Sequence, residues 1–396
     1  MQFEQAPDES EEPIGGVTPE PEPEPEPAPP APSVEEVEPP PAEPELRHEE
    51  PTEPQLVHPE LGWDWETGEL IEWRVVGEGA LSNGHVEIYG TSGAGKTQFI
   101  KSLLAQLHSK GSHFGVCDFK NDYGDDFPAR TGATFYDLWN ESLPYNPLAT
   151  DDATRRALLA LIIELRDTVD IAARSFTRLG HRQLHKLQEA LESAYDEKRR
   201  THNAFPTLLD VHAYLDDDLR GVIGDLTQTE LFGEGPPLGQ LIMNDVIFGL
   251  NHIPGTGLTT TLAAGFILAA IYLKLLEMPQ VYNEVIYTLV IDEAHRVASF
   301  HSVGSMVREL RSKGLAVILA TQRPGDLPGE AGTNAQTKIY MRLPDAQSAT
   351  AAARNLDPTD RNLAKAIRSL ADGEAFVALA GGPPKLVKLR QFWRDH

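Results

Sequence analysis

The sequence contains a single cysteine, Cys117, among its 396 residues. One thiol excludes an internal disulfide and a zinc site built from several thiolates, and it is compatible with a reducing compartment. Cys117 is expected to be a buried strand residue. The N-terminus also lacks the basic segment and apolar run of a secretory signal. These two absences predict a cytoplasmic protein.

Long uninterrupted apolar runs are also missing. The most apolar stretch, Leu258–Leu276, is interrupted by three consecutive threonines and by Lys274, whereas a membrane span needs about 20 predominantly apolar residues. We therefore expect a buried helix that lies against a covered parallel sheet, and no integral membrane segment.

Basic residues are almost absent from the first 60 positions. This segment holds 18 Asp and Glu against the single Arg47, which leaves −17 of the whole chain's formal charge of −26. It also holds 17 of the 31 prolines, so it cannot bury enough apolar surface to fold. Residues 1–60 are predicted to be a disordered Pro/Glu-rich tail, either a solubilising spacer or a docking arm for a basic partner.

After the tail, strand and helix patterns alternate as in an α/β fold with a mostly parallel sheet. The predicted core strands are Val86–Tyr89, Phe114–Phe119, Asp245–Leu250, Val285–Ile291 and Ala316–Ala320. A short hairpin is predicted around 63–73, and two more strands over 373–380 and 385–391. A helical insertion is predicted at about 148–225, with one helix over Arg182–Arg199. Residues 61–396 are thus predicted to be one domain.

A complete phosphate-binding loop follows the first predicted core strand and precedes a predicted helix. The pattern GxxxxGK[ST] is matched in the order Gly90, Thr91, Ser92, Gly93, Ala94, Gly95, Lys96 and Thr97. Its glycines let backbone N–H groups surround a β-phosphate, Lys96 supplies positive charge to the β- and γ-phosphates, and Thr97 offers a hydroxyl to Mg²⁺. These residues and the following Gln98 are the predicted nucleotide-binding set, with ATP and Mg²⁺ as cofactors.

Two carboxylates follow the apolar strand Val285–Ile291. Parallel strands of an open α/β sheet present ligand-binding groups at their carboxyl ends. Asp292 is expected to hold Mg²⁺ through water, and Glu293 to polarise the water that attacks the γ-phosphate. The alternative for such a pair is a helix N-cap. His295 either relays nucleotide state or packs.

The strand Ala316–Ala320 runs into Thr321, Gln322, Arg323 and Pro324. Gln322 is therefore predicted to lie beside the acidic pair and to sense the γ-phosphate. The alternative is a polar residue that closes the strand before a proline turn.

These motifs together resemble the FtsK–HerA superfamily of DNA-pumping ATPases, and in particular its HerA-like and TraG-like members. The resemblance rests on the phosphate loop, on Leu289–His295 and on Leu319–Pro324, and it spans roughly Val86 to Leu389. Further similar segments are Asp118–Tyr123, Arg308–Gly314 and Thr337–Leu343.

The resemblance implies a RecA-like P-loop NTPase core that assembles into hexameric rings around double-stranded DNA. It also implies that an arginine from the neighbouring subunit completes each active site, and Arg311, or else Arg308, matches the arginine-bearing segment. HerA-like members usually have a small β-barrel before the phosphate loop, for which only Leu61–Gly84 is available here. Neither the membrane helices nor the winged-helix tail of FtsK-like members is found.

The favoured hypothesis is a homohexameric ATPase that moves along duplex DNA. One alternative is a coupling ATPase for conjugation or secretion, and another is an ATP-controlled, ring-forming switch that recruits an effector such as a nuclease. A basic stripe at every fourth residue would be either a DNA contact or a solvated helix face; it comprises Arg174, Arg178, Arg182 and Lys186.

Overall fold

The computed structural model describes residues 58–75, 81–149, 181–201, 205–228, 230–253, 257–281, 284–298, 300–327, 334–380 and 382–395. Most of the predicted tail lies outside these residues, and so do Arg174 and Arg178 of the basic stripe. All predicted nucleotide-site residues and both candidate arginines lie inside them.

The folded region alternates strands and helices. The strands are β1 Glu60–Asp64, β2 Leu70–Glu72, β3 Val86–Tyr89, β4 His113–Asp118, β5 Thr134–Asp137, β6 Val246–Gly249, β7 Tyr287–Asp292, β8 Leu315–Thr321, β9 Thr337–Tyr340, β10 Glu374–Leu379 and β11 Lys385–Leu389. The α-helices are α1 Lys96–Ser109, α2 Phe127–Thr131, α4 His181–Thr201, α5 Leu208–His212, α6 Asp217–Gln228, α7 Gly257–Glu277, α8 His301–Glu309, α9 Ala346–Leu356, α10 Leu363–Arg368 and α11 Phe392–Asp395. Short 3₁₀ segments are η1 Leu238–Met243, η2 Ala294–Arg296, η3 Leu310–Lys313 and η4 Pro324–Asp326.

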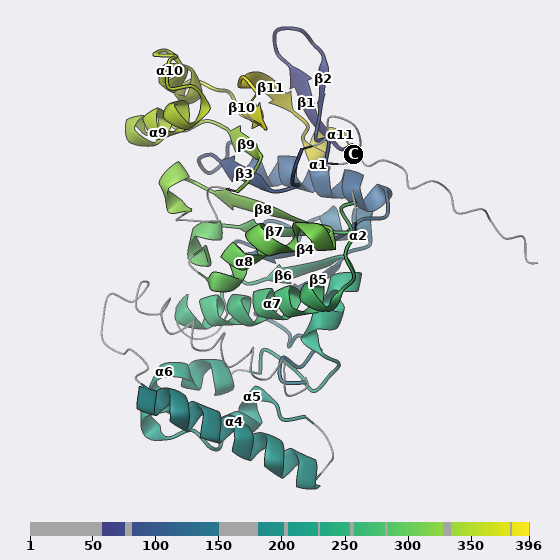
Figure 1. The fold of residues 1–396 in the computed structure, drawn as a ribbon, viewed down its shortest axis with the longest axis vertical. Helices are drawn as coiled ribbons and strands as arrows, with labels where there is room; N and C mark the ends of the chain where they lie inside the picture. Colours follow the sequence, from purple (N-terminus) through teal and green to yellow (C-terminus); the bar gives the residue numbers. More distant parts are fainter. Residues whose placement is uncertain are drawn as a thin grey trace, which may run out of the picture. The chain divides into compact units, whose positions relative to one another are not determined.

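The strands form one 11-stranded sheet in the order β2-β1-β11-β10-β9-β3-β8-β7-β4-β6-β5 (Figure 1). Neighbours from β9 to β5 in this order are parallel, and the strands on the other side of β9 are antiparallel. This confirms the expected α/β fold with a mostly parallel sheet. The predicted hairpin is also present, and it extends this sheet because β1 pairs with β11.

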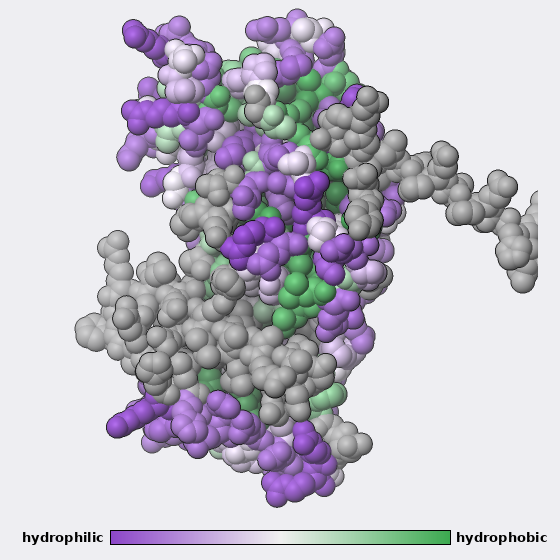
Figure 2. All heavy atoms as spheres, in the orientation of Figure 1, coloured by the Kyte–Doolittle hydropathy of each residue, from purple (hydrophilic) through white to green (hydrophobic). Residues whose placement is uncertain are grey.

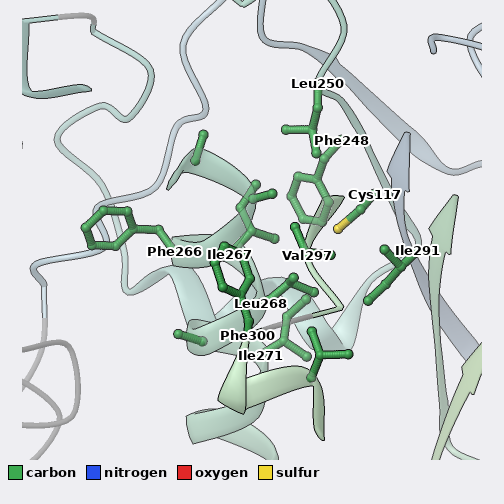
Figure 3. Close-up of a cluster of buried hydrophobic side chains, with 14 of the residues drawn as sticks. Cys117, Phe248, Leu250, Phe266, Ile267, Leu268, Ile271, Ile291, Val297 and Phe300 are labelled. Atoms are coloured by element: carbon green, nitrogen blue, oxygen red, sulfur yellow. The ribbon is translucent and has the colours of Figure 1, made fainter. Parts of the chain in front are cut away.

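Residues along the central strands alternate between two cores. Val290 and Ile318 face one side, where they join Phe99 and Leu103 of α1. Ile291 belongs to the other core, whose helix α7 presents residues such as Leu268 towards the sheet (Figure 3). Because a strand points successive side chains to opposite faces, both faces must be covered when every residue is apolar. The sheet is therefore held between helices, as the sequence predicted.

The apolar stretch that the sequence analysis assigned to a core helix is α7. Its segment Thr259–Glu277 is long and apolar enough to cross a membrane. However, 67% of its apolar stretch is buried inside the protein. Cys117, Phe248 and Ile291 of the sheet lie against its residues (Figure 3). This agrees with the expected helix on a covered parallel sheet.

The described part of the predicted helical insertion comprises α4, α5 and α6. Helix α4 covers the predicted helix Arg182–Arg199, and its Tyr195 hydroxyl donates to the Leu148 carbonyl at 2.6 Å. The outer surface of α4 is hydrophilic (Figure 2). Lys186 of the basic stripe forms an ion pair with Asp216, so one of its charges is already matched within the chain.

Burial of α7 should set much of the stability. Leu268→Ala removes a fully buried side chain (0% exposed) and should lower the free energy of unfolding by about 2–5 kcal/mol. Leu276→Ala in the same helix is the control, because Leu276 is 40% exposed. Urea unfolding followed by circular dichroism would measure both, and equal losses would contradict the assigned core.

Candidate functional site

The predicted site residues meet at one edge of the sheet. Strands β4, β7, β8 and β3 are consecutive and parallel, so their carboxyl ends lie together and the loops that follow them converge. These loops carry the phosphate loop, the acidic pair, Gln322 and, in addition, Lys120. The order of strands thus assembles one site from segments about 200 residues apart in the sequence.

The phosphate loop is held against the antiparallel part of the sheet. Its Thr91 N–H donates to the Arg342 carbonyl at 3.0 Å, and the Ala94 carbonyl accepts from Gly373 N–H at 3.0 Å. Gly95 has a φ of 102°, in the left-handed region, and a Cβ there would lie 3.0 Å from Gln391 Oε1. A side chain at Gly95 would be strained by both the backbone and its neighbour.

Other members of the predicted nucleotide-binding set line the same turn. Ser92 and Gly93 are exposed at its tip, whereas Gly90 is buried, and a Cβ on Gly90 would lie only 2.9 Å from Met341 Cβ. Gln98 lies in the first turn of α1, where its Oε1 accepts from Trp393 N–H at 3.3 Å. The loop therefore ends in a helix N-terminus, whose free N–H groups favour an anion.

Lys96 is the first residue of α1 and is 6% exposed. Its Nζ donates to the Gly90 carbonyl at 2.6 Å and to the Thr91 carbonyl at 3.1 Å. Burial lowers the pKa of Lys96, and the charge of Asp292 opposes this shift. The ammonium group is thus held inside the turn, where a phosphate would be a stronger partner than neutral carbonyls.

Thr97 and Asp292 meet beside Lys96. The Thr97 hydroxyl donates to Asp292 Oδ2 at 3.4 Å, and Asp292 is 2% exposed. Burial raises the pKa of Asp292 to about 6, against the opposing charges of Lys120 and Lys96. A hydroxyl and a carboxylate oxygen side by side are the hard ligands that Mg²⁺ prefers, so the residues present fit the predicted metal site.

Glu293 occupies an uncommon backbone conformation at the end of β7. Its φ of 61° and ψ of 44° are left-handed, and its N–H donates to Asp292 Oδ1 at 3.0 Å. Non-glycine residues adopt this conformation at a cost, and such residues concentrate at functional sites. The turn directs the Glu293 side chain, which is 4% exposed, back across the strand ends. A simple helix N-cap is not formed, because no side-chain cap bond is present at η2.

Three side chains contact the Glu293 carboxylate. Lys120 forms an ion pair with Oε1, while Gln322 Nε2 donates to Oε2 at 3.4 Å and His295 Nδ1 lies 3.4 Å from the same oxygen. Burial pushes the pKa of Glu293 upward, but the hydrogen bond and charge of Lys120 outweigh it, so this pKa lies below its usual value. The structure therefore brings Gln322 and His295 to the acidic pair.

Lys120 is the residue of this cluster for which the sequence analysis assigned no role. It lies two residues after β4, within the segment Asp118–Tyr123 that the resemblance singled out. A lysine directly after a parallel core strand could have been predicted as a site residue if that strand was known to lie next to the strand of the acidic pair. The sequence does not reveal the order of strands in the sheet, so this prediction could not be made.

The candidate arginines lie elsewhere. Arg308 is near the end of α8 and Arg311 is in η3, before the amino end of β8, whereas Gln322 follows its carboxyl end. Seven residues of strand separate the two ends, which is roughly 20 Å at about 3.3 Å per residue. Neither arginine therefore joins the nucleotide-site residues of its own chain.

The two arginines differ in their surroundings. Arg308 donates through Nη2 to Glu309 at 2.7 Å and to Ser305 at 3.2 Å. Arg311 is exposed, and its side chain makes no hydrogen bond or ion pair with another described residue. It lines a pocket at the amino edge of the sheet, with a volume of about 280 Å³, beside Glu284 and Leu81. Arg311 is thus the freer of the two to contact a second molecule.

The phosphate loop, the acidic pair and the doubly covered parallel sheet define the class as a RecA-like P-loop ATPase. Two families match the sequence, namely the helicase HerA-like C-terminal family over residues 266–392 and the type IV secretion-system coupling protein DNA-binding domain over residues 78–148. A search of curated protein sequences found no match. Both matches support the resemblance to the FtsK–HerA superfamily of P-loop ATPases.

Solved structures share this fold. VirB4 of Thermoanaerobacter pseudethanolicus has a TM-score of 0.61 at 17% identity, with 83% of this chain and 96% of that chain covered. The bacterial conjugative coupling protein TrwB, in its unbound monoclinic form, has a TM-score of 0.57 at 13% identity, covering 77% and 84%. TrwB in complex with ADP and Mg²⁺ gives 0.56 at 14% identity, covering 77% and 85%.

The assignment of Lys96 yields a direct test. Lys96→Ala should abolish binding of a fluorescent ATP analogue, because the loop loses its only charged side chain. Lys110→Ala, at the opposite end of α1 and exposed, is the matched control and should bind normally. Fluorescence anisotropy would measure both affinities, and an unaltered affinity of the Lys96 variant would refute this phosphate site.

Proposed function

We propose that this protein is a homo-oligomeric motor that hydrolyses ATP and uses the energy to move double-stranded DNA through a ring, with a hexamer as the expected assembly. The observation that carries the proposal is the division of the candidate active site between two edges of one sheet. The nucleotide residues lie at the carboxyl edge and Arg311 lies at the amino edge, so one chain cannot bring them together. Neighbouring copies in a ring can.

The cofactors are ATP and Mg²⁺. Residues Gly90 to Gln98 would hold the phosphates, and Thr97 with Asp292 would hold the metal, directly or through water. Mg²⁺ supplies charge that neutralises the phosphate oxygens during transfer. TrwB, which has a similar fold, has been solved with ADP and Mg²⁺ and with a non-hydrolysable ATP analogue.

Each of the remaining residues has a role set by its position. Glu293 would accept a hydrogen bond from the attacking water and polarise it. It can do so because it lies beside the metal ligand Asp292 but is not itself assigned to the metal. Gln322 donates a hydrogen bond to Glu293 and follows β8 directly, so it would transmit the presence of the γ-phosphate to that strand. Arg311 of a neighbouring copy would stabilise negative charge on the transferring phosphoryl group.

DNA as the substrate is favoured by the families that match the sequence. One is described as helicase HerA-like and the other as a coupling-protein DNA-binding domain. The charge balance gives no independent support, because the folded part has 33 Lys and Arg against 42 Asp and Glu. A ring could still place local basic groups around its pore.

A conjugation or secretion-coupling ATPase is the second candidate. The match to a type IV secretion-system coupling protein family over residues 78–148 favours it specifically. Both candidates are motors with the same hydrolytic site, and they differ in whether a secretion complex receives the moved DNA or protein.

Steady-state ATPase assays separate a DNA motor from the alternatives. Turnover should rise steeply with protein concentration, because complete active sites form only between copies. It should also be stimulated by linear duplex DNA, because DNA is the substrate that the motor moves. Turnover that depends on concentration but ignores DNA would favour the secretion-coupling ATPase, or a switch that recruits an effector such as a nuclease. Glu293→Gln should retain ATP and lose about 10²–10⁴-fold in kcat; normal turnover in that variant would sink the site assignment.

The shared site predicts complementation between two inactive variants. Arg311→Ala should lose about 10³-fold or more in kcat while still binding ATP. Mixing it with Glu293→Gln protein should restore part of the activity, since mixed rings contain interfaces with an intact Glu293 and an intact Arg311. The matched control is Arg308→Ala, which is expected to stay active alone. No recovery on mixing, with mixed assembly confirmed by crosslinking, would argue against Arg311 acting between copies.

A further inference from the structure

Lys120 has no role in the proposed hydrolysis, yet it forms an ion pair with the candidate catalytic glutamate. Its ammonium group pairs with Glu293 Oε1, and the Lys120 side chain is 33% exposed while that of Glu293 is 4% exposed. The lysine therefore reaches inward from the solvent side of the cluster. A buried carboxylate needs such a partner, because an unpaired charge in the protein interior is costly.

The backbone that carries Lys120 is fixed by the strand before it. Asp118 is fully buried, and its carboxylate accepts from Lys120 N–H at 3.0 Å and from Tyr123 N–H at 2.9 Å. Asn251 Nδ2 donates to the Lys120 carbonyl at 3.2 Å. The next residue, Asn121, has a left-handed φ of 59°. The backbone of Lys120 is thus held in place, whereas its flexible side chain can reach different nearby anions.

The same loop is tied to the phosphate-loop helix. Lys101 of α1 is 1% exposed, and its Nζ donates to Asp125 Oδ2 at 2.6 Å. The Lys101 ammonium also lies 5.4 Å from the ring centre of Tyr123 and 5.9 Å from that of Phe127, within range of a cation–π attraction. Lys120 is therefore placed relative to α1 as well as to β7.

Two lysines flank the acidic pair from different loops. Lys96 precedes Thr97, whose hydroxyl contacts Asp292, and Lys120 pairs with Glu293. A γ-phosphate bound by Lys96 would bring up to two negative charges into this group. It would compete with Glu293 for Lys120, since ammonium–phosphate contacts are strong charge-assisted hydrogen bonds.

We propose that Lys120 is the nucleotide-state sensor of this site: its ammonium group exchanges the Glu293 carboxylate for the γ-phosphate of ATP. The exchange releases Glu293 to orient the attacking water, and loss of the γ-phosphate returns Lys120 to Glu293. With ADP, Lys120 remains paired and Glu293 remains restrained. The inference rests on the proposed ATPase function and adds a phosphate-contacting residue to it.

The exchange predicts that Lys120 strengthens binding of ATP but not of ADP. Lys120→Ala and the similarly sized Lys120→Gln should weaken the affinity for ATPγS at least about tenfold, the effect of losing one charge-assisted hydrogen bond. Affinity for ADP should change by less than about twofold. Lys120→Arg should restore much of the ATPγS preference, and Lys110→Ala should leave it unchanged.

Titration calorimetry with ATPγS and with ADP, in the presence of Mg²⁺, measures these affinities on the full chain. Loss of the ATPγS preference in Lys120→Gln, with rescue by Lys120→Arg, would support the sensor. An equal loss for both nucleotides would show a merely structural lysine, and an unchanged ratio would show that Lys120 never meets the γ-phosphate; either result overturns the inference. If the unaltered protein binds neither nucleotide, the proposed ATPase function fails first, and the sensor fails with it.

Discussion

Buried negative charge at the carboxyl edge of the sheet is the constraint on which the rest of the structure depends. Asp118, Asp292 and Glu293 lie at the ends of adjacent strands, each 3% exposed or less, and carboxylates so placed must be paired or hydrogen-bonded. Asp118 is satisfied by backbone N–H groups, whereas the acidic pair depends on Lys96, Lys120 and polar neighbours. These lysines could also bind a phosphate, which would couple the charge of the cluster to the bound nucleotide.

In the proposed mechanism, the sheet that positions this cluster also keeps one required group away from it. Parallel strands gather the nucleotide residues at one edge and leave Arg311 at the other, beyond the reach of any side chain. A single copy therefore has the groups to bind ATP and orient water, but it lacks the cation expected to stabilise the transferring phosphoryl group. Assembly would supply that cation, and hydrolysis would then depend on how neighbouring copies are arranged.

In the proposed motor, communication between the two edges would have a physical route through β8. This fully buried strand has η3, with Arg311, before it and Gln322 after it, and Gln322 contacts Glu293. A second connection runs through the loop after β4, which contacts Glu293 through Lys120 and α1 through Asp125. Rigid secondary structure of this kind can transmit a local change without large rearrangement.

Local patterns in the sequence determined the phosphate loop, the acidic pair after β7 and every strand from which the nucleotide site is built, because these depend on glycine spacing and apolar periodicity within about ten residues. Strands β5 and β9 were not predicted, since each has only two apolar or aromatic residues among its four, whereas the equally short β3 and β6 have three. Only the tertiary structure decided that Lys120 contacts Glu293 and that Arg311 lies at the far edge. Both follow from the order of the strands, which is fixed by packing between residues distant in the chain.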